Sequence, residues 1–255
     1  RQAIDHGETH AWGNLGDLHC DNLKNYVIAE KYYLKAAQEG HYDSVRLLGW
    51  MYENKLKNYA QAEKYYRQAI DNGEDYARIN LGYLYHKRIK DFDLAAEYYK
   101  SAVEKEQFEG FWRLGDVLVD KEDYDGAEKY YRQAIDKEEY SAWEYLGDLY
   151  RDKKEDYKKA EIFYKECRKH YESDGLSSLA ELYYEYQKDF NKAEQLCLDA
   201  IKNSSSEAMN YISWIYFLEK IKAKEAYAYA TTSYEKIKKD YVAHTLTCVS
   251  TWNEN

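Results

Sequence analysis

Two stretches decide the fold of this chain, RQAIDHG at residues 1–7 and RQAIDNG at residues 67–73, and they differ in one residue. A Leu-Gly pair recurs with the same rhythm, as Leu15-Gly16, Leu48-Gly49, Leu81-Gly82, Leu114-Gly115 and Leu146-Gly147, and Leu179-Ala180 and Ile212-Ser213 continue the series. Successive pairs are 33 residues apart, with one step of 32. Self-similarity at such a period indicates stacked structural repeats rather than one compact core.

Residues 43–73 show what one repeat contains. The spacing i, i+3, i+4, i+7 predicts a first helix carrying Val45, Leu48, Gly49 and Tyr52. Residues 53–59 break this period and form a turn. A second helix follows with Ala62, Tyr65, Tyr66, Ala69 and Ile70, and Asn72-Gly73 ends it. We expect Gly49 to let one helix approach the backbone of the other, with tyrosines filling the space around that contact.

The repeat resembles the tetratricopeptide family and its relatives, the Sel-one-like repeats. One unit shows the pattern in Trp143, Leu146, Gly147, Tyr150, Ala160, Tyr164 and Cys167. The resemblance implies an all-α, right-handed solenoid of antiparallel helix pairs, with about seven repeats and partial terminal helices. It also implies that first helices line a concave face where partners bind. The residues involved are packing residues, so the resemblance leaves the biochemistry open.

The repeat rhythm never lapses, so we predict one solenoid over residues 1–255. The chain begins inside an expected second helix, which indicates a fragment of a longer protein. After Ser213 we expect a second helix from about Ala223 to Lys238, and a further first helix from Asp240 to Trp252 that covers the apolar end of the stack. The four cysteines show no C-x-x-C spacing, which favours buried free thiols in a reducing, cytoplasmic compartment.

Composition limits the possible partners. The net charge of −10 disfavours nucleic acid and anionic membrane surfaces. Proline is absent, which suits nearly continuous helix. No apolar run approaches the roughly 20 residues that a membrane span requires. We therefore expect no nucleic acid partner and no membrane insertion.

Five positions of each first helix should face inward: −6, −3, +1, +4 and +5 from the glycine. Over seven repeats these 35 positions hold three basic residues, Arg46, Lys87 and Arg151, and fourteen carboxylates. The carboxylates are Asp17, Asp21, Asp43, Glu53, Glu109, Asp116, Asp120, Glu144, Asp148, Asp152, Asp174, Glu181, Glu185 and Glu207. The predicted face thus carries −11, against −10 for the whole chain. Alternatively, these charges serve only to keep a thin solenoid soluble.

An acidic face steers a basic partner, and exposed aromatic rings anchor it or hold its cations. We therefore predict binding of a protein or peptide with a basic, partly apolar segment, for example a toxin or effector. The predicted contact residues are Trp50, Tyr83, Trp112, Asp116, Asp120, Glu144, Asp148, Asp152, Glu181, Tyr184, Glu185 and Trp214. The main alternative is a scaffold that self-associates through its ends or convex face. A carbohydrate-binding role ranks below both.

Catalysis and cofactors find no support in the sequence. The seven histidines show no metal-ligand spacing, and no phosphate-binding or nucleophile motif occurs. His86 lies one repeat from both Glu53 and Asp120, which resembles a metal site. Stacked charged helices bring such residues together by default, so we predict no metal, no cofactor and no enzymatic activity.

Overall fold

The computed structural model describes residues 9–170 and 172–253, and this part of the chain consists of helices and short turns. It divides into two compact units, of which the first ends at Lys137 and the second begins at Glu138. The repeated RQAIDHG stretch at residues 1–7 lies outside the described residues, as does the helix predicted to contain it. No helix in the described ranges is long and apolar enough to cross a membrane.

Each first helix is followed by its second helix, and four first helices end in a wider π-helical turn, labelled η. Unit 1 contains α1 (Thr9–Asp17), η1 (Leu18–Asn22), α2 (Tyr26–Gln38), α3 (Asp43–Asn54), α4 (Tyr59–Asp71), α5 (Ala77–Tyr83), η2 (Leu84–Ile89), α6 (Phe92–Glu104), α7 (Glu109–Asp120) and α8 (Tyr124–Asp136). Unit 2 contains α9 (Ala142–Asp148), η3 (Leu149–Lys153), α10 (Tyr157–His170), α11 (Glu172–Glu181), η4 (Leu182–Tyr186), α12 (Phe190–Lys202), α13 (Ser206–Glu219), α14 (Ala223–Ile237) and α15 (Asp240–Asn253).

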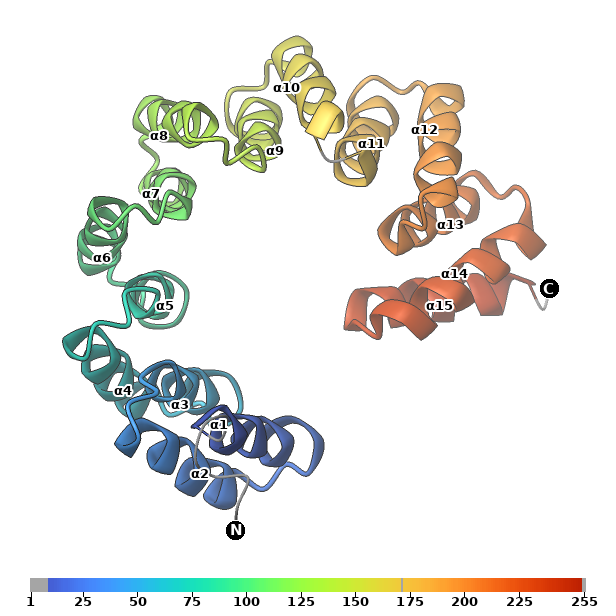
Figure 1. Ribbon diagram of the computed structural model, residues 1–255. Coiled ribbons are helices and arrows are strands. Elements are labelled where there is room, and N and C mark those ends of the chain that lie inside the picture. The colour runs from blue at the N-terminus through green and yellow to red at the C-terminus, as the bar shows by residue number, and fades with distance from the viewer. Residues whose placement is uncertain (1–8, 171, 254–255) are drawn as a thin grey trace. The chain divides into compact units, whose positions relative to one another are not determined.

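Within each unit the helix pairs stack in chain order, which confirms the predicted all-α repeat solenoid. In unit 1 the first helices α1, α3, α5 and α7 lie on one side and the second helices α2, α4, α6 and α8 on the other (Figure 1). The predicted last helices are confirmed as α14 and α15. Val242 and Val249 of α15 are fully buried, so this helix covers the end of the stack as expected.

Every turn from a first to a second helix in the first six repeats is built alike. A residue with positive φ reverses the chain, and these residues are Lys24, Lys57, Lys90, Glu122, Glu155 and Lys188. An Asn or Asp follows and accepts a hydrogen bond from the backbone N–H three residues on, as Asn58 does from Gln61 at 3.1 Å. Such a cap satisfies a free N–H at the helix start. The turns therefore position each second helix accurately.

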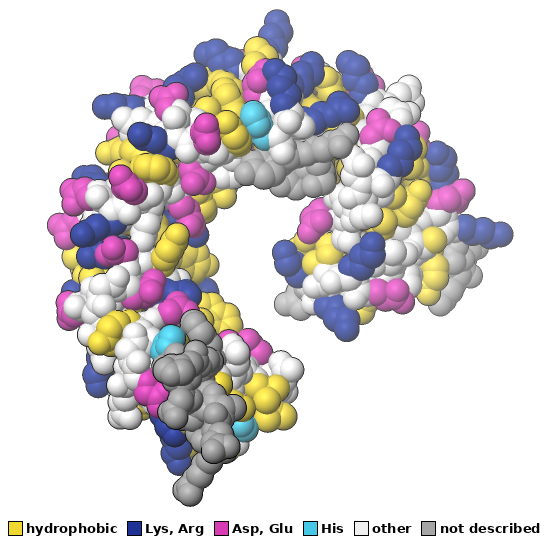
Figure 2. All heavy atoms as spheres, in the orientation of Figure 1, with side chains coloured by type: hydrophobic (Ala, Val, Ile, Leu, Met, Phe, Trp, Pro, Cys, Tyr) yellow, Lys and Arg dark blue, Asp and Glu magenta, His cyan; other side chains and the backbone are white. Residues whose placement is uncertain are grey.

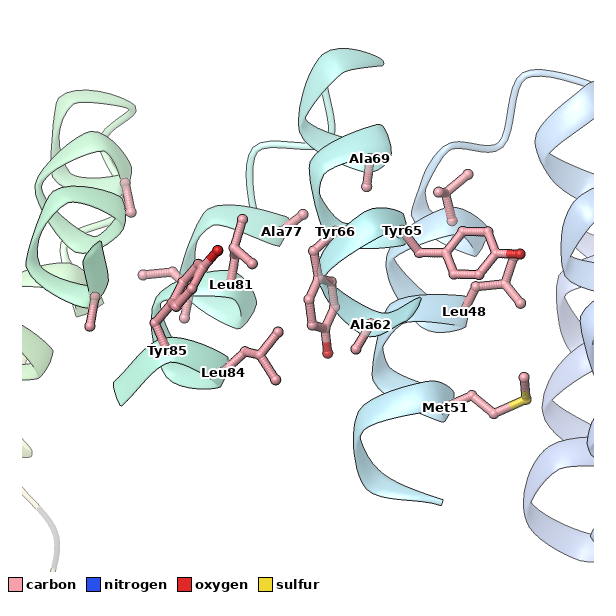
Figure 3. Close-up of a cluster of buried hydrophobic side chains, with 14 of the residues drawn as sticks. Leu48, Met51, Ala62, Tyr65, Tyr66, Ala69, Ala77, Leu81, Leu84 and Tyr85 are labelled. Carbon is pink, nitrogen blue, oxygen red and sulfur yellow. The ribbon is translucent and has the colours of Figure 1, made fainter. Parts of the chain in front are cut away.

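The core of each repeat is a tyrosine ring laid against a glycine. Tyr66 of α4 is fully buried, and a Cβ placed on Gly49 of α3 would lie 2.5 Å from its ring. Figure 3 shows Tyr66 with Leu48, Ala62 and Leu81 among the buried side chains between the helices of unit 1. We expected glycine to admit the backbone of the second helix. That detail was wrong, because the atoms nearest to Gly49 belong to the Tyr66 side chain.

Several carboxylates of the first helices accept hydrogen bonds from the buried tyrosines. Hydroxyl groups of the second helices donate to carboxylates of the same repeat in four pairs: Tyr33 to Asp17 at 2.7 Å, Tyr66 to Glu53 at 3.0 Å, Tyr131 to Asp116 at 2.8 Å and Tyr164 to Asp148 at 2.7 Å. A buried hydroxyl needs such a partner, since burial without one is costly. Four of the fourteen predicted carboxylates therefore stabilise the fold directly.

Repeat 3 lacks this bond, which allows a test within one unit. Tyr83 replaces the carboxylate, and the buried hydroxyl of Tyr99 donates to no acceptor among the described residues, although the Arg113 guanidinium interacts with it. We expect Tyr66→Phe to lower the free energy of unfolding by about 2 kcal/mol, because Glu53 loses a donor. Tyr99→Phe removes a hydroxyl that has no carboxylate acceptor, so the free energy of unfolding should fall by less than in Tyr66→Phe. Chemical denaturation of both variants checks this, and equal losses would contradict it.

All four cysteines are free thiols, as predicted. Cys20, Cys167 and Cys197 are buried, and burial is the main reason that the pKa of the Cys197 thiol rises to about 12. The thiolate is therefore strongly disfavoured at Cys197.

Candidate functional site

In unit 1 the first helices enclose a hollow that contains two of the predicted contact residues. A pocket of about 270 Å³ is lined by Trp50, Glu53, Asn54, Ile79, Asn80, Tyr83 and Arg113. A second pocket of about 420 Å³ shares Ile79, Asn80 and Arg113 with the first, and Tyr76 lines it as well. Both lie along α3, α5 and α7. The first helices of unit 1 therefore offer a polar and aromatic recess.

Aromatic rings in and beside this recess already make cation–π contacts with basic side chains of the same chain. The Arg113 guanidinium lies 4.3 Å from the ring centre of Trp112 and 5.7 Å from that of Tyr83. Arg88 lies 5.5 Å from Tyr83, and the Lys55 ammonium lies 5.0 Å from Trp50. At these distances the rings attract the cations. Cation–π contacts thus form at the predicted rings, but with internal partners.

The two predicted carboxylates of unit 1 are also engaged. Burial raises the pKa of Asp116, although the hydrogen bond from Tyr131 opposes the rise. Burial acts in the same sense on Asp120, but hydrogen bonds from His86 at 2.7 Å and Lys87 at 3.2 Å outweigh it and lower the pKa of Asp120. Asp116 therefore serves the fold, and Asp120 forms a small ion-paired group with η2.

The contact between His86 and Asp120 does not extend into a metal site. Glu53, the third residue considered, instead bonds to Arg88 at 3.1 Å and to Tyr66. Burial lowers the pKa of His86, which favours the neutral ring. Across the described residues no three His, Cys, Asp or Glu side chains are grouped so as to hold a metal ion.

In unit 2 the predicted carboxylates converge on one arginine. We call Arg151, Asp148, Asp152 and Glu181 the Arg151 cluster. The guanidinium lies 3.2 Å from Asp148, 2.6 Å from Asp152 and 3.1 Å from Glu181. Its side chain is 11% exposed, whereas the carboxylate side chains are 39–44% exposed. One buried positive charge thus faces three carboxylates that still reach solvent, and an excess of negative charge remains.

For Asp148 and Glu181, burial affects the pKa of the carboxyl group more than Arg151 does. Burial raises the pKa of Asp148, and Arg151 and the hydroxyl of Tyr164 only partly oppose it. The pKa of Glu181 is raised for the same first reason, again with Arg151 opposing. Concentrated negative charge in partly desolvated surroundings is what a bound cation relieves.

Three other predicted residues surround or extend this region. Glu185 on η4 is exposed and makes no hydrogen bond or ion pair among the described residues. Glu144 on α9 accepts a hydrogen bond from Ser178 at 2.7 Å. The hydroxyl of Tyr184 donates to Glu219 at 2.8 Å. Among the predicted contact carboxylates of unit 2, Glu185 is therefore the one without a partner in the described part of the chain.

Trp214, the last predicted contact residue, belongs to an aromatic group at the end of unit 2. Its ring centre lies 5.4 Å from that of Phe217 and 6.2 Å from the imidazole of His244 on α15. Phe217 in turn meets Trp252 edge to face at 6.0 Å. Trp214 thus helps to hold α15 in place, in addition to any role in binding.

Sequence reasoning missed Asn80, Arg88 and Arg113, which all line or cover the recess of unit 1. Asn80 and Arg113 occupy position −2 from the glycine, seven residues before position +5. Residues seven apart lie on one side of a helix, so this signal was present in the sequence. Arg88 lies within η2, where the wider turn changes the direction of side chains. Periodicity alone gives no sign of that change.

Charge is consequently more balanced than the sequence count indicated. Arg88 and Arg113 add positive charge to the first helices of unit 1. On the face shown in Figure 2, basic and acidic side chains are interleaved in both units. The Arg151 cluster with Glu185 is where acidic groups outnumber basic ones most clearly among the contacts described.

Stacked helix pairs with recesses along their first helices define a helical-repeat protein. A tetratricopeptide repeat model matches residues 55–109 and 113–173. Comparison with curated proteins finds no match. Solved structures with similar folds include a Sel1 repeat protein from Oxalobacter formigenes, at 27% identity and a TM-score of 0.56 over 75% of this chain and 84% of that one. Residues 55–109 and 113–173 are thus tetratricopeptide repeats, and the fold of the chain is that of tetratricopeptide and Sel1-like repeat proteins.

Two further structures are similar in fold alone. Yeast Tom70 is 15% identical with a TM-score of 0.78, over 96% of this chain and 54% of that one. Protein c5321, a protective antigen present in uropathogenic Escherichia coli strains, is 20% identical with a TM-score of 0.56, over 98% of this chain and 58% of that one. This chain therefore spans little more than half the length of either protein. Repeats of this family are typically scaffolds that bind proteins or peptides.

Proposed function

We propose that this interaction module binds a protein segment rich in lysine or arginine, and that the first helices of unit 2 are its docking face. The observation that carries the proposal is the Arg151 cluster, in which one guanidinium lies among three carboxylates. A partner cation would supply the missing positive charge, and clustered charge of one sign also speeds and orients encounter.

The aromatic residues of unit 2 favour a segment that is apolar in part. Tyr184 and Trp214 are partly exposed on first helices of the same unit. Tyr and Trp commonly anchor interfaces, since they bury a large area with few rotatable bonds. In unit 1 the corresponding rings are covered by Lys55, Arg88 and Arg113, so we assign the cation-binding role to unit 2.

The test reverses charge at carboxylates that accept no hydrogen bond from a buried tyrosine. Asp116 and Asp148 are unsuitable, because each accepts a hydrogen bond from a buried tyrosine. Glu181 and Glu185 lie on α11 and η4 and remain accessible. We expect the double variant Glu181→Lys, Glu185→Lys to weaken binding of a synthetic Lys- and Tyr-containing peptide at low salt by at least about tenfold.

The matched control is Glu225→Lys, Glu235→Lys, which makes the same change in net charge on the second helix α14. Both residues are exposed, and neither has a hydrogen bond or ion pair within the described part of the chain. Isothermal titration should show the control within a factor of two or three of the wild type. Equal weakening in both variants would mean that total charge, and not this face, attracts the peptide. Unchanged affinity in the first variant would reject the proposal.

A further inference from the structure

Unit 1 has a second exposed surface, at the edge where first helices turn into second helices. Leu23, Leu56 and Ile89 occupy the same position in three successive repeats, seven residues after the glycine. They are 57%, 41% and 42% exposed. Val27, at the start of α2, is 67% exposed. Isolated exposed aliphatic residues are common, but a row repeated at one edge forms a patch.

The first two members of this row flank a hollow. It measures about 470 Å³ and is lined by Leu23, Lys24, Asn25, Tyr26, Val27, Glu30, Tyr52 and Leu56. The one carboxylate in it, Glu30, accepts hydrogen bonds from Tyr52 at 2.9 Å and Tyr65 at 3.0 Å. The hollow is therefore largely apolar, and its acid is already satisfied.

A lysine follows each aliphatic residue of the row. Lys24, Lys57 and Lys90 are exposed and have φ values of 51°, 55° and 67°. Within the described residues, none of the three ammonium groups forms an ion pair or hydrogen bond. Each belongs to a turn that the following cap residue holds in place. The edge thus presents fixed pairs of one aliphatic and one unpaired basic residue.

Unit 2 has a hollow at the equivalent place, but different residues line it. The equivalent hollow measures about 550 Å³ and is lined by Glu155, Asp156, Tyr157, Lys158, Glu161 and Gln187. Gln187 stands where unit 1 has Leu56, and Lys154 stands where it has Leu23. Packing of the repeat therefore does not require an aliphatic residue at this place. Among the first six repeats, an aliphatic residue and a lysine stand together at this turn only in the first three.

We propose that this turn edge of unit 1, formed by Leu23, Lys24, Leu56, Lys57, Ile89 and Lys90, binds an acidic amphipathic segment of a partner protein. An apolar side chain of the segment occupies the hollow between Leu23 and Leu56. Carboxylates beside it pair with Lys24 and Lys57. This site lies on different elements from the Arg151 cluster and takes the opposite charge, so it is independent of the function proposed above.

A protein segment fits this surface better than a lipid bilayer does. The apolar groups line a recess, which receives a protruding side chain, whereas insertion into a bilayer requires groups that project from the surface. The unpaired ammonium groups are placed beside the recess, where carboxylates of a bound helix would lie. Amphipathic helices are commonly recognised in this way, through apolar anchors seated in a groove.

The test uses a labelled synthetic helical peptide with leucine at helical spacing on one face and glutamate elsewhere. A peptide of the same composition, with its leucines spread around the helix, is the ligand control. Fluorescence anisotropy should show binding of the first peptide that weakens with salt. We expect Lys24→Glu with Lys57→Glu to weaken it at least about tenfold. Leu56→Ser should weaken it severalfold.

Glutamate is compatible with these turns, since Glu122 and Glu155 adopt the same positive φ. The matched control is Lys188→Glu with Lys220→Glu, two exposed lysines in unit 2 with φ of 57° and 56°. It should bind as the wild type does. No binding of the first peptide, equal binding of both peptides, or equal loss in the control would overturn the proposal. Binding only to phosphatidylserine vesicles, or self-association that Lys24→Glu with Lys57→Glu abolishes, would also overturn it.

Discussion

Gly49→Ala should destabilise unit 1 by about 3 kcal/mol or more, because the added methyl group would clash with the core of the repeat. The new Cβ would lie 2.5 Å from Cδ1 and 2.6 Å from Cε1 of Tyr66. Tyr66 is fully buried and its hydroxyl donates to Glu53, so the ring has no open space to enter. Overpacking of a rigid core typically costs 1–3 kcal/mol, and here a hydrogen bond is strained as well. Urea denaturation followed by circular dichroism measures the loss.

Gly13→Ala is the control for this prediction. Gly13 lies in α1, another first helix of unit 1, but the nearest atom to its new Cβ would be Ser44 Oγ at 3.5 Å, an ordinary contact. Alanine has the higher helix propensity, so this variant should gain up to about 1 kcal/mol. If Gly49→Ala were as stable as Gly13→Ala, the Tyr66 ring would not be held against the glycine. Smaller residues at position 66 should rescue Gly49→Ala, because they remove the clash.

Glu53→Ala should lower the free energy of unfolding by about 3 kcal/mol. Its side chain is 2% exposed and serves two partners, accepting from Tyr66 at 3.0 Å and pairing with Arg88 at 3.1 Å. Removal leaves the Tyr66 hydroxyl buried without an acceptor and the Arg88 guanidinium without its counter-ion. Breaking a buried pair on one side typically costs 3–5 kcal/mol. Arg88 is 29% exposed and regains some hydration, which places the expected value at the low end.

Asp93→Ala is the control that tests whether the burial of Glu53 explains the large loss of stability expected for Glu53→Ala. Asp93 pairs with Lys121 at 2.8 Å, a shorter distance than that of the Glu53 pair, but the two side chains are 87% and 42% exposed. Exposed pairs contribute little, so the stability of this variant should stay close to that of the wild type. Similar losses in Glu53→Ala and Asp93→Ala would show that the environment of Glu53 is not special. Denaturant midpoints of the two variants, measured in the same buffer, decide this.

The hydrogen bonds between buried tyrosines and carboxylates change the interpretation of the acidic first helices. Asp17, Glu53, Asp116 and Asp148 are bonded to buried tyrosines, so part of the negative charge counted in the sequence is used for stability. Charge reversal at such residues would impair the fold and obscure any effect on binding. Glu181 and Glu185 separate the two roles.

The architecture could be predicted from the sequence. The period of 33 residues and the spacing of apolar residues predicted the helix pairs, down to α14 from Ala223 and α15 from Asp240. It also predicted that the tyrosines are mainly structural. These features are local, since they depend on helical periodicity and on turn residues within one repeat, and the same pattern recurs in each repeat.

The partners of the polar side chains, in contrast, depend on how the helices pack. Asp116 and Asp148 share one position with Trp50 and Tyr83, yet the first two accept buried hydroxyls and the other two line a recess. Arg88 and Arg113 lie over the ring of Tyr83, which we predicted to contact a partner. Asp116 and Asp148 lie 15 and 16 residues from the tyrosines that bind them, on a different helix. Arg113 likewise reaches Tyr83 from another helix, and η2 changes the direction of the residues it contains. Side-chain partners across helices therefore depend on packing that helical periodicity does not specify.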